Sequence, residues 1–542
     1  MKKQNEELKE KKNHPKATDP FTLFLTIATA VIGAIIGLQL IVTLGISANT
    51  AIIGALLAMV ISRIPIRVLN KYRSVHRQNL IQTSISSATF GAANSLMIPI
   101  GIPFIMGETG LILPMLIGAA LAMLLDATIL YKLFDTKIFP ASETWPPGVA
   151  TAESIVAGDQ GGKRAGLLGI GAAGGIFGSF LGVPMSAFGV AFIGNIWAIT
   201  MFGIGLLLRA YSGPLFGVDL NKSYIPHGFM IGAGLVALIQ VALIIFKKNK
   251  SVNVSKKEIA ASVDSPIPDE TRTDKDISKA FGYGFLAYLA VAFILAIMGG
   301  ILTDMSLGMF IIYLLFASFA AFVHEIIVGI AAMHSGWFPA FAVALITLII
   351  GMLIGFPPVA LGLLVGFSAA TGPAFADMGY DLKTGYMLRG NGKDREFELS
   401  GRKQQYITSM IAFVVATLVV FFAYNSYFAQ NLVAPVDKVY VATIEAGVSK
   451  HIAWELFLWA IPGALLQFFG GTKRQMGVLF ATGLLIFYPM AGWAVIAGIL
   501  IRVIVLKVKG QQAETPMSIL AAGFIAGDAL YSFFSSIFKI SK

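Results

Sequence analysis

The stretch WPPGVATAESIVAGDQGGKR, residues 145–164, interrupts a largely apolar chain with proline, glycine and charged residues. Apolar segments flank it on both sides, at 110–133 and 165–185. Inside a bilayer such an irregular backbone would leave amide groups without hydrogen-bond partners unless protein or water supplied them. We therefore expect this stretch either at the membrane edge or dipping inward where protein surrounds it. Interrupted backbone at membrane depth is a common position for a transport site.

The composition of the whole chain indicates a helical membrane protein. It has 542 residues, of which 56% are hydrophobic and 13% are charged, whereas soluble domains carry about 25% charged residues. Because apolar runs of membrane-spanning length recur, the predicted fold class is an all-α polytopic membrane protein with roughly 12–16 transmembrane or re-entrant helices. The 57 glycines suit close helix packing. The absence of cysteine excludes disulfides and thiolate metal sites.

The distribution of charge divides the chain into four expected parts. These are a cytoplasmic N-terminal tail over 1–20, a first transmembrane half over 21–246, a polar cytoplasmic linker over 247–279 and a second transmembrane half over 280–542. Lys and Arg gather in the tail and in loops, as the positive-inside rule predicts for a cytoplasmic N-terminus. The net charge of +11 therefore indicates membrane topology rather than nucleic-acid binding.

A weak internal repeat supports the division into two related halves. Glu108 lies 39 residues before Pro147, and His334 lies 39 residues before Pro373, so that the two pairs are offset by 226. Duplicated halves with interrupted segments at matching positions are typical of transporters. The alternative is a chance recurrence of turn residues in a glycine-rich chain.

Four segments resemble those of the oligopeptide transporter (OPT) family, including its yellow-stripe-like metal-chelate branch. They are Asn79–Thr83 (NLIQT), Pro147–Leu168, the pair Asp381–Leu388 (DLKTGYML) and Arg402–Gln405 (RKQQ), and Ala521–Leu530 (AAGFIAGDAL). The segments follow the family's order and cover most of the chain. Residues 390–399 separate the two parts of the third segment and resemble an insertion relative to the family's pattern.

The resemblance implies secondary active transport. The family takes up short oligopeptides, or metals held by peptide-like chelators, and is driven by a proton gradient. On this reading the protein is not an enzyme and needs no cofactor. A passive channel and an intramembrane enzyme are the alternatives, and proton-driven uptake would separate them, because a channel transports only downhill.

Three candidate residues for substrate binding or proton coupling lie in the first half. Glu108, between glycines at the end of an apolar run, suits a substrate amine or a proton, or is a surface carboxylate. Glu153 lies in the interrupting stretch, where burial would suit it to proton binding. Alternatively it pairs with Lys163 or Arg164, and we also retain Lys163 as a candidate. Asp126 lies within an apolar run, and we expect a structural role for it.

The remaining candidates lie in the second half. His324 and Glu325 are adjacent within a long apolar run, where ionisable groups are costly and often functional. The alternative is a hydrogen-bonded pair that joins helices. His334 is a weaker candidate near the end of the same run. Three further candidates follow a run of small residues and suit a peptide carboxylate or a solvated loop: Asp377, Asp381 and Lys383.

The partners expected from the sequence are few. The histidines lack paired metal-ligand spacing, so we expect no protein-bound metal. The expected partners are the lipid bilayer and a small peptide or metal-chelate substrate, with a homo-oligomer left open and no nucleic acid. The expected location is a bacterial plasma membrane.

Overall fold

The computed structural model describes residues 14–45, 54–55, 57–58, 67–143, 145–158, 163–220, 222–237, 239–240, 243, 271–335, 340–447 and 449–540. In these ranges the chain is helical, with one isolated bridge between Phe134 and Phe139 and no strand. Among the described residues, ten stretches of helix are long and apolar enough to cross a membrane, and four shorter apolar helices accompany them. The all-α polytopic fold class and the predicted range of helices are confirmed.

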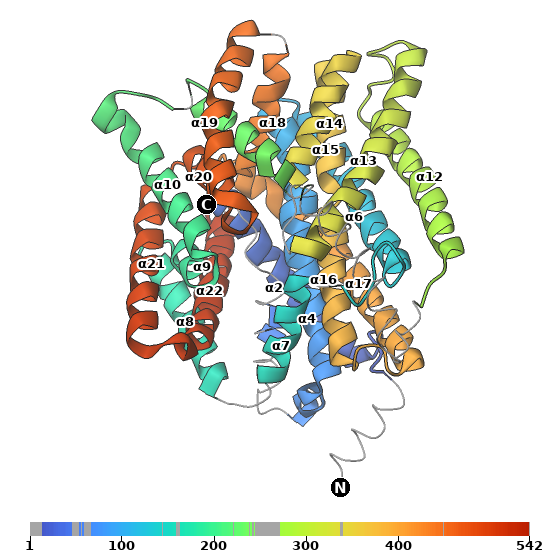
Figure 1. Ribbon diagram of the computed structural model, residues 1–542, viewed down its shortest axis with the longest axis vertical. Coiled ribbons are helices and arrows are strands. Elements are labelled where there is room, and N and C mark those ends of the chain that lie inside the picture. The colour runs from blue at the N-terminus through green and yellow to red at the C-terminus, as the bar shows by residue number, and fades with distance from the viewer. Residues whose placement is uncertain are drawn as a thin grey trace, which may run out of the picture.

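The helices form two packed groups (Figure 1), each with its own apolar core. The large bundle contains α4 (Val75–Phe90), the π-helical turn η2 (Gly91–Met97), α5 (Ile98–Ile105), α6 (Ile112–Leu133), α7 (Pro146–Gly158), α12 (Asp274–Met298), α13 (Leu307–Ser335), α14 (Ala340–Ile354), α15 (Pro358–Ala370), α16 (Pro373–Leu388), α17 (Arg395–Phe428) and α18 (Pro435–Ala446). The small bundle contains α8 (Lys163–Phe180), α9 (Met185–Ile193), α10 (Ile196–Phe216), α19 (Lys450–Arg474), α20 (Met476–Leu485), α21 (Pro489–Lys509) and α22 (Glu514–Ile540).

The remaining elements connect these groups or border them. Helix α2 (Pro20–Leu44) packs against α4 and α17 of the large bundle and against α22 of the small bundle. Short 3-10 turns occur at η1 (Arg67–Arg73), η3 (Thr109–Leu111) and η4 (Gln511–Ala513). Each bundle thus combines helices from both expected sequence halves. Of the expected linker 247–279, only 271–279 is described, and α12 begins within it.

Two of the membrane-spanning stretches are interrupted, and they lie side by side. One runs from Val75 to Ile105 and passes from α4 through the π-helical turn η2 into α5. The other runs from Pro358 to Leu388 and breaks between α15 and α16. Because α4 contacts α16 and α5 contacts α15, the two stretches run antiparallel and their interruptions meet inside the large bundle. Discontinuous helices such as α15–α16 form the binding sites of many transporters.

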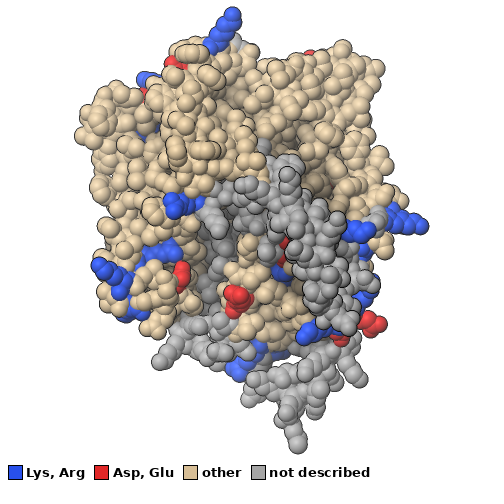
Figure 2. Space-filling model, viewed as in Figure 1, with Lys and Arg blue, Asp and Glu red and all other residues tan. Residues whose placement is uncertain are grey.

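The outer surface suits a bilayer. Large apolar side chains such as Phe422, Leu353 and Phe469 are more than 70% exposed on the flanks of the helices. On the face shown in Figure 2, most Lys and Arg side chains lie in the lower half, toward the end where the N-terminus lies in Figure 1. Such a one-sided distribution of basic residues is typical of the cytoplasmic end of a membrane protein.

Glycines bring α8 and α22 into backbone contact. Both helices carry two glycines four residues apart, and such small residues allow membrane helices to approach closely. Side chains added at these positions would meet backbone carbonyls of the facing helix: Leu520 opposite Gly171, Phe524 opposite Gly175, and Ala172 opposite Gly527. The Ala521–Leu530 segment therefore has a packing role at this crossing.

Gly175→Ala tests this crossing. The added methyl would lie 2.5 Å from the carbonyl oxygen of Phe524, so we expect a loss of about 1–3 kcal/mol of stability, as in other overpacked cores. The matched control is Gly169→Ala on the same helix, because no atom lies within 4 Å of the methyl added there. Thermal unfolding in detergent measures both variants, and equal midpoints would contradict the assignment.

Candidate functional site

A buried polar interface joins α16 to α4 at the centre of the large bundle. Asp377 and Asp381 are one helical turn apart on α16, and both side chains are fully buried. Ser86 of α4 donates a hydrogen bond to Asp377 at 2.7 Å, and Gln82 donates to Asp381 at 2.6 Å. Ser87 lies 3.2 Å from the second carboxylate oxygen of Asp381. Two carboxylates therefore face a row of uncharged polar groups.

Two of the four segments that carry the family resemblance converge here, and one of them contributes both of its parts. Gln405, from the RKQQ segment on α17, donates to the main-chain oxygen of Asp381 at 2.6 Å and to the hydroxyl of Thr83 at 3.2 Å. Thr83 belongs to the NLIQT segment and Asp381 to the DLKTGYML segment. A third segment, Pro147–Leu168, joins through α7, because the hydroxyl of Thr384 donates to the carbonyl of Gly148 at 3.1 Å. These three segments thus form one site, whereas Ala521–Leu530 lies on α22 in the small bundle.

The acidic residues of this site lack a basic partner. No ion pair among the described residues includes Asp377 or Asp381. One carboxylate oxygen of Asp377 has no hydrogen-bond partner in the described part of the chain. Lys383 donates instead to the carbonyl of Ala141 at 2.8 Å and is only 6% exposed. Because all three candidates are buried, the solvated-loop alternative is wrong.

His324 and Glu325 point to different partners from the same helix, α13. Both side chains are fully buried. The Nδ1 atom of His324 lies 3.1 Å from the hydroxyl of Ser368 on α15. A carboxylate oxygen of Glu325 lies 2.6 Å from the hydroxyl of Tyr288 on α12. The two residues therefore contact separate helices, as the angle of about 100° between helical neighbours requires.

The interrupting stretch starts with a buried anchor. Trp145 is fully buried, and its amide donates to the carbonyl of Met333 at 2.9 Å. Helix α7, which follows, has 13 residues and packs on α16. It is too short to cross a bilayer, because a spanning helix needs about 20 residues. The expected interruption at this position is therefore present.

Two other candidates lie outside the buried site. Glu108 and Glu153 are both exposed, although the prediction for Glu153 supposed that it is buried. The side chains of Lys163 and His334 lie outside the described residues. The roles in substrate binding or proton coupling that the sequence suggests for these four residues remain predictions.

A network of charged residues closes the end of α16. Arg389 donates to Glu398 at 2.7 Å, and Arg402 contacts both Glu398 and Asp135 at 3.2 Å. The two arginines and Glu398 are at most 5% exposed. Glu398 belongs to the insertion at residues 390–399, so this insertion supplies the acid between the two arginines.

Asp135 lies in the loop after α6, outside the membrane-spanning helices. Burial raises its pKa, but hydrogen bonds from Thr271 and the charge of Arg402 outweigh this effect, so that the pKa lies below its ordinary value. The hydroxyl of Thr271 donates to Asp135 at 2.6 Å. The ionised carboxylate therefore ties the segment before α12 to the end of the large bundle.

Sequence reasoning missed the partners of these acids. Asp126, expected to be structural, is fully buried and lies 2.6 Å from the hydroxyl of Tyr288. It also accepts a hydrogen bond from the amide of Gly372 at the break before α16, at 2.5 Å. An ionisable group inside an apolar run was the signal for Asp126. Tyr288 carried no such signal, because tyrosine is ordinary in a membrane helix.

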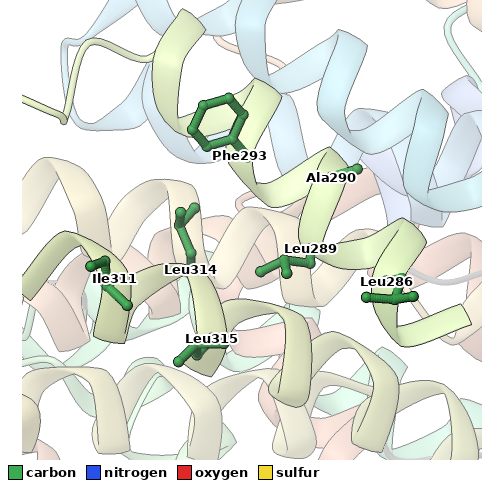
Figure 3. Close-up of a pocket in the computed structure, with 7 residues that line it drawn as sticks. All are labelled: Leu286, Leu289, Ala290, Phe293, Ile311, Leu314 and Leu315. Atoms are coloured by element: carbon green, nitrogen blue, oxygen red, sulfur yellow. The ribbon is translucent and has the colours of Figure 1, made fainter. Parts of the chain in front are cut away.

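The described residues offer no group of three or more His, Asp or Glu side chains placed to hold a metal. A groove between α12 and α13 opens on the outer flank (Figure 3) and is lined by Leu286, Leu289, Ala290, Phe293, Ile311, Leu314 and Leu315. Because all of these side chains are apolar, the groove suits lipid and offers no partner to the polar backbone of a peptide.

The interrupted antiparallel helices and the buried polar site are features of a membrane transport protein. A family model described as OPT oligopeptide transporter protein matches residues 21–232 and 181–539. The chain therefore belongs to the oligopeptide transporter family, as its motifs predicted. Searches among curated proteins and among solved structures gave no match.

Glu398→Gln tests the charged network. Removing one partner of a buried ion pair typically costs about 3–5 kcal/mol, because the remaining charges stay buried. We expect a clear drop in the thermal unfolding midpoint. Glu396→Gln is the matched control, since Glu396 lies in the first turn of the same helix and is exposed. Indistinguishable midpoints for the two variants would show that the network adds no stability.

Asp135→Asn gives a pH-dependent result. The pKa of Asp135 in the folded protein lies below its ordinary value of 3.8, so its stabilising effect is present above that pH and is lost as the pH falls through the folded value. We expect the variant to unfold at a lower temperature than the wild type at pH 7. This difference should shrink below pH 3.8. A difference that stays constant with pH would contradict the ionised role of Asp135.

Proposed function

We propose that this protein takes up short oligopeptides or peptide-like metal chelates together with protons, by alternating access. The observation that carries the proposal is the pair Asp377 and Asp381, fully buried on an interrupted helix and facing only uncharged polar groups. A buried carboxylate without a cation is costly. A positively charged substrate group would supply the missing partner.

The chemistry of the site favours a substrate with an ammonium group or a chelated cation. The free oxygen of Asp377 is a ready acceptor, and the row of hydroxyl and amide groups on α4 can pair with peptide backbone. Lys383, one turn from Gly379 on the same helix, lies over the ring of Tyr386 and donates a hydrogen bond to the main-chain carbonyl of Ala141. It is therefore able to exchange that contact for a substrate carboxylate.

Alternating access requires a closed end and a part that moves. The charged network of Arg389, Glu398 and Arg402 supports a closed end below the site. The N-terminal tail packs on the same end, because the amide of Ala17 donates to Gln404 on α17 at 2.8 Å. With the N-terminus in the cytoplasm, as the basic residues favour, this closed end faces the cytoplasm. The break between α15 and α16 is the natural hinge.

Uptake into proteoliposomes tests the proposed function. The probes are a labelled library of short peptides and, separately, ferric and nickel chelates, each with and without an inward proton gradient. We expect accumulation that collapses with a protonophore. Accumulation of chelates alone would show that the substrate is a metal chelate rather than a peptide. Downhill movement alone would favour a channel, and no transport of either probe would overturn the proposal.

Asp377→Asn and Asp381→Asn test the binding role. Truncating a buried charged contact costs about 2–5 kcal/mol of binding, so we expect each variant to lose most of its affinity for peptide while its unfolding midpoint stays near that of the wild type. Asp304→Asn, in an exposed loop, is the control. Unchanged uptake by both variants would show that Asp377 and Asp381 do not bind the substrate.

A further inference from the structure

The hydroxyl of Tyr288 lies between two carboxylates that come from different helices. Its oxygen is 2.6 Å from Asp126 on α6 and 2.6 Å from Glu325 on α13. All three side chains are fully buried. The other oxygen of Glu325 has no hydrogen-bond partner among the described residues. These short contacts join three helices of the large bundle through a single phenol.

Counting protons shows what this geometry requires. A tyrosine hydroxyl has one hydrogen and can donate it to one acceptor only. The second contact of 2.6 Å is a hydrogen bond only if a carboxylic acid donates to the phenol oxygen, because ionised carboxylates accept but do not donate. Two ionised carboxylates around one phenol would also repel each other. The arrangement is therefore satisfied when Asp126 and Glu325 share one added proton.

The cluster is connected to the break between α15 and α16. The second oxygen of Asp126 accepts the amide hydrogen of Gly372, at 2.5 Å. Gly372 has φ of +95°, a conformation that favours glycine, and it is followed by Pro373 at the start of α16. One carboxylate thus contacts both the proton-sharing phenol and the backbone at the break.

Few other titratable groups face this cluster. From α13, His324 packs against the break, and its ring carbon would lie 3.3 Å from a side chain added at Gly372. From α16, Asp377 and Asp381 face α4 instead. Helix α15 has no titratable side chain. No ion pair among the described residues reaches Asp126 or Glu325. Proton exchange at the cluster is thus the main way to change its charge.

We propose that Asp126, Tyr288 and Glu325 form the site that binds the transported proton and that its occupancy controls the α15–α16 break. Losing the proton leaves one phenol hydrogen for two carboxylates, so one of them must find another donor or move away. Asp126 then competes with Glu325 for the hydrogen of Tyr288 while its other oxygen holds the amide of Gly372. Movement of Asp126 therefore displaces the helix that starts at Pro373, together with Asp377 and Asp381. This proposal rests on the proposed proton-coupled function.

Infrared spectroscopy tests the shared proton without any substrate. Difference spectra of the purified protein between low and high pH contain the carbonyl stretch of protonated carboxylic acids. We expect one such band to disappear in Asp126→Asn and in Glu325→Gln. Tyr288→Phe keeps both acids and removes both hydrogen bonds of the phenol, so the band should shift rather than vanish. Tyr427→Phe is the matched control, because Tyr427 is 1% exposed and its hydroxyl has no partner among the described residues.

Transport separates this proposal from the proposed function. With labelled tetra-alanine as the probe, Glu325→Gln should lose accumulation driven by a proton gradient but keep exchange of labelled for unlabelled peptide at equal pH. If the wild type fails to transport the probe, the proposed substrate is wrong while the infrared result still decides the proton site. A carboxyl band that is unaltered in both acid variants, or gradient-driven accumulation in Glu325→Gln equal to that of the wild type, would overturn the proton site.

Discussion

Every backbone amide that leaves helical pairing inside a bilayer must find another acceptor, because lipid offers none. At the break between α15 and α16 that acceptor is the carboxylate of Asp126, which binds the amide of Gly372. This hydrogen bond explains why an acidic residue occupies the apolar helix α6. It also makes the geometry of the break sensitive to the charge on Asp126. The rest of the site follows from where the break directs α16.

The polar groups along α16 change in character from its start to its end. Near the break, Asp377 and Asp381 face hydroxyl and amide groups on α4 and lack a cation. At the far end, Arg389 and Arg402 surround Glu398 in a complete ionic network. Complete pairing stabilises a closed end, whereas incomplete pairing leaves room for a charged substrate. In the proposed function, α16 therefore combines a closing contact with a binding surface.

The sequence predicted the helical membrane class and the interruption that contains α7, because both depend on composition and local chain chemistry. It also singled out Glu325, because charges in apolar runs are conspicuous, and Asp377 and Asp381, because they follow a run of small residues. It could not reveal that Tyr288 joins Asp126 to Glu325, because tyrosine gives no pattern and these residues are distant in the chain. Nor did hydropathy distinguish the buried Asp381 from a loop residue. Such contacts depend on helix packing, which periodicity does not specify.

The central claim is that the α15–α16 region opens alternately to the two sides of the membrane. The chain has no cysteine, so Ala374→Cys places a single thiol in the buried first turn of α16. Labelling by a membrane-impermeant maleimide is then measured from each side of oriented vesicles, with and without peptide and a proton gradient. The account predicts labelling from both sides, with the balance shifted by peptide and protons. A thiol that stays unlabelled from one side under every condition would contradict it.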